Sequence, residues 1–144
     1  LMNGTSGTVF SPNAATTRGM IVTILARMDG VNTSGTPWYE AGREWAIANG
    51  VSDGTNMDGK ITREQLAAML SRYAALKNRD VSAIASISAY ADASSVSNWA
   101  ANAMRWAVGE GLIQGSNNSL RPQSNATRAE VATILMRFCE LLKK

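Results

Sequence analysis

The 144-residue sequence predicts an all-α fold made of three copies of a two-helix unit, and two repeated patterns predict it. First, the pair Thr-Arg occurs three times, each time opening a run whose apolar residues are spaced like one face of a helix. The three pairs are Thr17-Arg18, Thr62-Arg63 and Thr127-Arg128. Second, all four tryptophans lie at two repeat positions, because Trp38 and Trp45 recur as Trp99 and Trp106. Such self-similarity is typical of repeat architectures.

The Thr-Arg runs are expected to be helices that begin at a threonine N-cap. Gln65 and Glu130 stand three residues after the second and third threonines, which predicts a capping box in both copies. In the first copy Met20 takes that position. We therefore expect that box to be broken, with only the hydroxyl of Thr17 left to cap the helix.

The Trp runs are expected to form the second helix of each unit. Residues 38–51 and 99–112 align with each other, and Gly50 and Gly111 are expected to end these helices as C-cap glycines. The small residues Gly42 and Ala103 beside the indoles predict close packing against a neighbouring helix. We expect all four indoles to lie in the core, where each ring can bury a large apolar area.

These patterns divide the chain into copies at residues 1–30, 31–77 and 78–144, together forming one domain. Residues 78–90 are read as a linker inserted into the third copy. The first copy lacks its Trp helix, so we expect the chain to be a fragment with that helix upstream. The first Thr-Arg helix should then expose apolar surface. We expect either a partner chain to cover it, such as a second copy in a homo-oligomer, or a mobile N-terminal prong.

The composition excludes several chemistries. The net charge is +3, histidine is absent, and Cys139 is the single cysteine, so neither a disulfide, a multi-cysteine metal site nor a histidine-based catalytic pair can form within the chain. We expect no cofactor, no metal and no enzymatic activity. The arginines are dispersed among acids, which does not predict a nucleic-acid surface. No apolar run reaches the length of a membrane span.

Residues 54–65 faintly resemble a calcium-binding loop. Asn56, Asp58 and Gly59 fit the pattern, but Gly54 and Gln65 stand where a calcium loop carries Asp and a bidentate Glu. An ordinary Asp-Gly turn is the reading we favour.

Several motifs together resemble the S-layer homology (SLH) family. Residues 127–130 read TRAE, and residues 90–92, the third-copy Trp run and the Gly111–Gly115 turn match the rest of that repeat. Residues 62–65 and 17–20 look like degenerate versions of the tetrad. The resemblance implies a pseudo-threefold bundle of helix-loop-helix repeats. It also implies an anchor that binds an anionic secondary cell-wall polysaccharide, often pyruvylated, in grooves between the repeats.

The resemblance further implies a set of ligand-binding residues. They are the tetrad arginines Arg18, Arg63 and Arg128, the acid Asp92 ahead of the third-copy Trp helix, and the turn glycines Gly4, Gly54 and Gly115. The second copy has no acid equivalent to Asp92, and the first copy begins after that point. At most one groove is therefore expected to hold the full set.

The position of the arginines supports an anion site without the family. A cation in the first turn of a helix is locally unfavourable, so its repetition suggests a further role. A guanidinium beside free helix N–H groups would suit a carboxylate such as a pyruvate ketal. Alternatively, each arginine pairs with a carboxylate of the neighbouring copy and stabilises the bundle.

The sequence thus predicts that the chain anchors a secreted bacterial protein non-covalently at the cell wall and cell surface. The apolar C-terminal run ends in Lys143-Lys144, which looks like a natural terminus and would place this anchor at the tail of the parent protein. The alternative is a structural repeat module that mediates protein assembly and has lost its affinity for polysaccharide.

Overall fold

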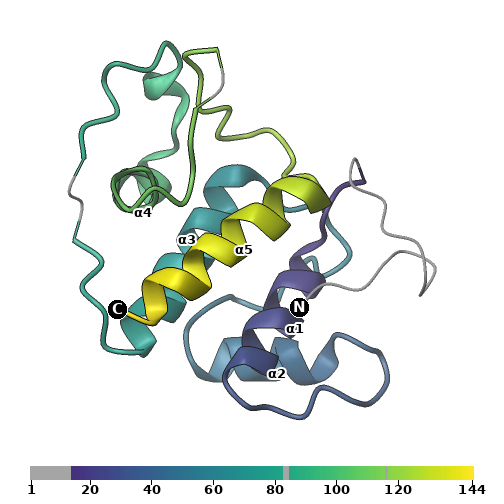
Figure 1. The fold of residues 1–144 in the computed structure, drawn as a ribbon. Helices are drawn as coiled ribbons and strands as arrows, with labels where there is room; N and C mark the ends of the chain where they lie inside the picture. Colours follow the sequence, from purple (N-terminus) through teal and green to yellow (C-terminus); the bar gives the residue numbers. More distant parts are fainter. Residues whose placement is uncertain (1–13, 83–84, 116) are drawn as a thin grey trace. The chain divides into compact units, whose positions relative to one another are not determined.

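The computed structural model describes residues 14–82, 85–115 and 117–144, and this part of the chain is all-α, as predicted. The α-helices are α1 (Arg18–Met28), α2 (Glu40–Ala48), α3 (Arg63–Leu76), α4 (Ala101–Gly109) and α5 (Arg128–Leu142) (Figure 1). Two short 3₁₀ turns, η1 (Ala93–Ser95) and η2 (Asn98–Ala100), precede α4. Among the described residues no strand forms, and extended backbone before the Thr-Arg helices makes only isolated bridges.

The capping boxes of the second and third copies are confirmed. The backbone N–H of Thr62 donates to Gln65 Oε1 at 2.9 Å, and the N–H of Gln65 donates back to the threonine hydroxyl at 3.3 Å. Thr127 and Glu130 make the same pair of hydrogen bonds, at 2.9 and 3.1 Å. The helices α3 and α5 therefore begin where the sequence predicts.

The prediction of a broken box in the first copy is wrong. The Met20 N–H donates to the Thr17 hydroxyl at 3.2 Å, and the Thr17 N–H donates to the Met20 thioether Sδ at 3.5 Å. The reason is chemical, because a thioether sulfur is a weak acceptor that can stand where Gln or Glu presents an oxygen. All three Thr-Arg helices thus begin with a reciprocal cap.

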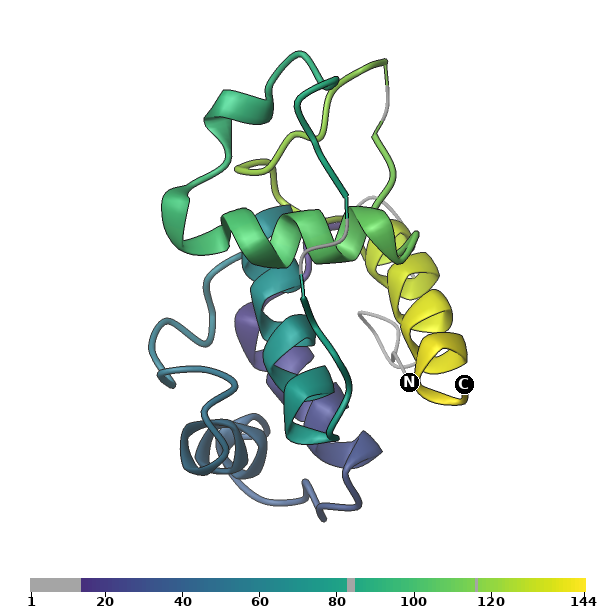
Figure 2. The ribbon, with the colours of Figure 1, turned by 90° about the vertical axis from the view of Figure 1, so that its left-hand side faces the viewer.

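The chain divides into two compact units, residues 1–61 with 126–132 and residues 62–125 with 133–144. In the first unit α2 packs on α1, and a Cβ added at Gly42 would lie 2.8 Å from the Cα of Thr23. This close approach confirms the packing role predicted for Gly42. In the second unit α4 runs across α3 (Figure 2), and the rings of Tyr73 and Trp106 each contact Phe138 edge-on.

The expectation that the first Thr-Arg helix exposes apolar surface is also wrong. The apolar side chains of α1 between Ile21 and Ala26 are at most 4% exposed. Gly42 contributes to this burial, because the absence of a side chain there lets α2 approach the backbone of α1 closely. The exposed apolar surface on which the homo-oligomer was predicted is therefore absent from this helix. The homo-oligomer itself stays a prediction.

The tryptophans separate into a buried pair and an exposed pair. Trp45 and Trp106 are 8% and 1% exposed, as predicted, whereas Trp38 and Trp99 are 49% and 58% exposed. The prediction that all four indoles lie in the core is wrong, because α2 and α4 begin only after Trp38 and Trp99. The two indoles of one copy therefore do not share a single helix face. The C-cap prediction holds, since Gly50 and Gly111 follow the helices at φ 71° and 76°.

Candidate functional site

The Thr-Arg helices begin against loops that precede another Thr-Arg pair. For α1, the N–H groups of Arg18 and Gly19 donate to the carbonyls of Gly59 (2.9 Å) and Met57 (2.8 Å). For α3, the N–H groups of Arg63 and Glu64 donate to the carbonyls of Ser124 (3.0 Å) and Pro122 (3.0 Å). For α5, the Arg128 N–H donates to the carbonyl of Ala14 at 2.9 Å. Each acceptor for an arginine N–H stands three residues before a threonine cap. Because these N–H groups are occupied, the expectation of free helix N–H groups beside the guanidinium is wrong.

In the second unit, Arg63 and Asp92 hold one peptide group from both sides. The Arg63 Nε donates to the carbonyl of Leu120 at 2.9 Å, and its Nη2 donates to the carbonyl of Gln114 at 3.3 Å. Asp92 Oδ1 accepts the Leu120 N–H at 2.8 Å, and its Oδ2 accepts the Arg121 N–H at 2.8 Å. Two residues implied by the family resemblance thus meet at Leu120, where they determine the path of the loop.

The contacts of Asp92 favour its charged form. The Leu120 N–H lowers the pKa of the carboxyl most, partial burial opposes this, and the N–H and positive charge of Arg121 lower the pKa further. Asp92 is therefore an ionised hydrogen-bond acceptor at neutral pH.

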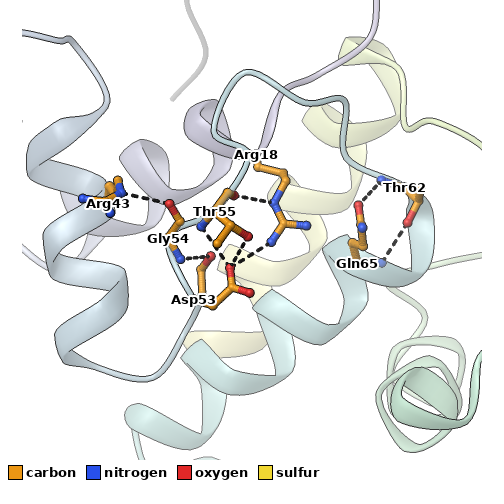
Figure 3. A network of polar contacts seen from close by, with 8 residues as sticks. Arg18, Arg43, Asp53, Gly54, Thr55, Thr62 and Gln65 are labelled. Carbon is orange, nitrogen blue, oxygen red and sulfur yellow. Dashed lines mark hydrogen bonds and ion pairs between the residues drawn. The ribbon is translucent and has the colours of Figure 1, made fainter.

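In the first unit, a similar network surrounds the carbonyl of Thr55 (Figure 3). The Arg18 Nε donates to this carbonyl at 3.2 Å, and the Arg18 Nη2 lies 3.5 Å from Asp53 Oδ1. The same Asp53 oxygen accepts the N–H and the hydroxyl of Thr55, at 3.0 and 2.7 Å. Arg43 adds a hydrogen bond from its Nε to the carbonyl of Gly54 at 2.8 Å. Sequence reasoning missed Asp53, Thr55 and Arg43.

The third arginine, Arg128, lies in the first unit and is 4% exposed. Its Nη1 approaches the Met20 Sδ at 3.8 Å. Gly4, which the resemblance implies as a ligand-binding turn glycine, lies outside the described residues.

The two described turn glycines leave room for neighbouring side chains. At Gly54 the backbone has φ +77°, and an added Cβ would lie 2.4 Å from Ile47 Cδ1. At Gly115 an added Cβ would lie 2.2 Å from the ring of Tyr90. Packing therefore explains both glycines, and their contact with a ligand remains a prediction.

The contacts also bear on the two roles considered for the tetrad arginines. Arg18 pairs with a carboxylate, as the structural alternative expected, while Arg63 donates to carbonyls and is 4% exposed. These side chains hold loops in place. Direct contact of these arginines with a ligand stays a prediction.

Residues 56–59 form a turn within the 54–65 segment, in agreement with the reading favoured over a calcium loop. The Gly59 N–H donates to the Asn56 carbonyl at 2.9 Å, and Asn56 adopts φ 54°. Nowhere in the described parts of the chain do three or more acidic or cysteine side chains gather to hold a metal ion.

A signal for the missed residues was present in the sequence. Thr55 and Leu120 each stand seven residues before a threonine cap, so counting backwards from the caps pairs them. Counting forwards from Gly54 and Gly115 hides this pairing, because the third-copy loop is longer.

Comparison with known proteins identifies part of the chain. The family model described as the S-layer homology domain matches residues 89–132. This segment is therefore similar to the S-layer homology (SLH) domain. It contains Asp92, Leu120 and Arg128. Arg63, whose Nε donates to the carbonyl of Leu120, lies outside the matched segment.

Three relatives resemble most of the chain. They are an amylopullulanase of Thermoanaerobacterium thermosulfurigenes (26% identical over 97% of the chain), an endoglucanase of Bacillus sp. strain KSM-635 (29% over 94%) and cell surface glycoprotein 1 of Acetivibrio thermocellus (34% over 76%). The chain spans only 8%, 16% and 5% of these relatives. Separately, none of the helices in the described part of the chain has the length and apolarity needed to cross a membrane.

Proposed function

We propose that the chain anchors an exported bacterial protein to the cell wall at the cell surface, by non-covalent binding of an anionic secondary cell-wall polysaccharide. The SLH match supports this function. So do relatives that include a cell surface glycoprotein and two enzymes, because one anchoring module can serve parent proteins of different activity. The chain itself is assigned no catalytic role.

The observation that carries the proposal is the loop held by Arg63 and Asp92. The exposed residues of this loop include Asn117, Asn118 and Arg121, all with positive φ. Amide side chains and a guanidinium suit the hydroxyls and carboxylate of an acidic sugar, such as a pyruvate ketal.

In this proposal, the arginines and the acid implied by the family position the loops. Arg63 and Arg128 are both 4% exposed. Arg63 fixes the loop at Leu120, and Arg128 contacts Met20 of α1. Arg18, whose side chain is 15% exposed, and the residues Asp92, Gly54 and Gly115 shape the loops in the same way.

A pull-down on purified cell-wall sacculi tests the function. We expect the chain to bind sacculi and to lose binding after acid extraction of the secondary polymer. Arg121→Ala should weaken binding about tenfold, the effect of one charge-assisted hydrogen bond. Lys143→Ala removes an exposed cation at the end of α5 and should leave binding unchanged. Binding that survives extraction would contradict the polysaccharide as ligand.

A second candidate is a module for protein assembly that has lost affinity for polysaccharide. The specific observation in its favour is that the helix N-termini are capped by loop carbonyls while Trp38 and Trp99 are exposed. Retention on extracted sacculi, together with loss of retention in Trp99→Ala, would support this candidate instead.

A further inference from the structure

The capping box of α1 holds Met20 at the position where the other two boxes hold Gln65 and Glu130. In those two boxes a side-chain Oε1 accepts the N–H of the threonine cap at 2.9 Å. In the first box the acceptor is the Met20 sulfur, 3.5 Å from the Thr17 nitrogen. A thioether is a weaker acceptor than an amide or carboxylate oxygen. The Thr17 N–H therefore makes the weakest of these three hydrogen bonds.

Oxidation would give Met20 the acceptor that the other two boxes have. A methionine sulfoxide carries its oxygen on Sδ, and glutamine carries Oε1 on Cδ, so each oxygen follows Cβ, Cγ and one further atom. The sulfoxide is also polar, as the amide is. Rotation about the Cγ–Sδ bond can direct the oxygen to the Thr17 N–H from either configuration at sulfur. An oxidised Met20 would thus resemble Gln65 in its box.

The Met20 sulfur already faces two hydrogen-bond donors. The Thr17 N–H donates to it at 3.5 Å, and Arg128 Nη1 donates to it at 3.8 Å. Both donors belong to the same unit as Met20. The S–O bond of a sulfoxide places negative charge on oxygen, and a guanidinium forms a stronger hydrogen bond with a charged oxygen than with a thioether. An oxygen on this sulfur would therefore be stabilised by both donors.

We propose that Met20 is a modification site, oxidised by a peroxide to a sulfoxide that strengthens the cap of α1. Met20 is only partly buried, whereas Met57, Met69 and Met104 are at most 5% exposed. The sulfur lone pair attacks one oxygen of hydrogen peroxide, which forms the S–O bond and breaks the O–O bond. Sulfur loses two electrons, and the departing hydroxide takes the proton of the transferred hydroxyl and leaves as water.

The expected effect is opposite to the usual one. Methionine oxidation commonly disrupts a protein, because it places a polar group in apolar surroundings where no partner satisfies it. At Met20 the sulfoxide oxygen meets the Thr17 N–H and the Arg128 guanidinium. Oxidation at this position should therefore stabilise the first unit. The proposal is independent of the proposed function, so either can fail without the other.

Peroxide treatment of the full chain, followed by peptide mass spectrometry, tests where oxygen is added. The chain first receives Met2→Leu, Met28→Leu and Met136→Leu, which leaves Met20 and three buried methionines. Leucine is close to methionine in volume, so these changes should be tolerated. Met20 should take up one oxygen atom before the buried methionines do. Oxidation of Met20 no faster than that of Met57 would refute the proposal.

Melting and amide hydrogen exchange then measure the effect of the sulfoxide. The melting temperature should rise by roughly 2–6 °C, the effect of one improved hydrogen bond in a chain of this size. Exchange of the Thr17 amide hydrogen should slow about threefold to tenfold. Exchange of the Thr62 and Thr127 amide hydrogens should stay unchanged, since their acceptors are oxygens already.

The matched control carries Met20→Leu in the same background and should melt at the same temperature before and after treatment. Met20→Gln supplies the oxygen without peroxide, as Gln65 does in α3, and should reproduce the rise in melting temperature. This variant tests the cap even where the oxidised chain does not fold. A melting temperature that does not rise in Met20→Gln, or that falls on oxidation of Met20, would overturn the proposal.

Discussion

At the scale of single residues, charged side chains in this protein mainly hold backbone. Arg63 and Asp92 bind the carbonyl and the N–H of Leu120, and Arg18 and Asp53 bind the carbonyl and the N–H of Thr55 in the first unit. Hydrogen bonds that involve a charged partner are stronger than neutral ones, so two of them can determine the conformation of an otherwise irregular loop.

The lowered pKa of Asp92 predicts a dependence of stability on pH. Because the pKa is lower in the folded chain, the stabilisation is present in full above the unfolded pKa of about 3.9 and is lost as pH falls through the folded value. Asp92→Asn keeps an acceptor without the charge. The melting temperature of the wild type should exceed that of the variant near pH 6 and converge with it in strong acid. A difference that stays constant in circular-dichroism melts would contradict this coupling.

The two classes of tryptophan predict unequal losses of stability. Trp45 is buried and its Nε1 donates to Asp29 at 3.0 Å, so Trp45→Ala should cost about 3–5 kcal/mol. Trp38 is half exposed, and Trp38→Ala should cost about 1 kcal/mol. Urea unfolding of both variants measures the difference. Equal losses would mean that Trp38 has a core role that its exposure does not indicate.

At the scale of elements, each helix is defined by its ends and by one close contact. The caps at Thr17, Thr62 and Thr127 set where α1, α3 and α5 begin. Packing of α2 on α1 then depends on the absence of a side chain at Gly42, whose Cβ position lies beside the Thr23 backbone.

The sign of the change in the free energy of unfolding on substitution of Gly42 tests this contact. On helix propensity alone, Gly42→Ala should stabilise α2 by about 0.5–1 kcal/mol. The steric overlap with Thr23 instead predicts destabilisation by about 1–3 kcal/mol in urea unfolding. Glu44→Ala, on the exposed side of α2, is the control and should change stability by less than about 0.5 kcal/mol. A stabilised Gly42→Ala would refute the close approach.

At the scale of the whole molecule, the chain forms two units that do not coincide with its sequence copies. The helix α5 contributes residues 128–132 to the first unit and continues into the second. The first unit therefore combines residues up to 61 with the segment 126–132, and the boundaries at 30/31 and 77/78 remain predictions about repetition only.

The oligomeric state is a prediction at this scale. The homo-oligomer expected from the incomplete first copy should give a light-scattering mass that is a multiple of 15.3 kDa. A single species at 15.3 kDa over a wide range of concentration would contradict it, and would agree with the burial of the apolar residues of α1.

The sequence by itself determined the helices and most of their ends, because periodicity and capping are local properties of neighbouring residues. It also picked out Arg63 by its repeat position, whereas Asp92 was implied only by the resemblance to the SLH family. Only the tertiary structure decided which peptide these residues hold, because the contact from Arg63 to Leu120 spans 57 positions and that from Arg18 to Thr55 spans 37. Asp53 was missed for the same reason: its role depends on an arginine that no local pattern connects to it.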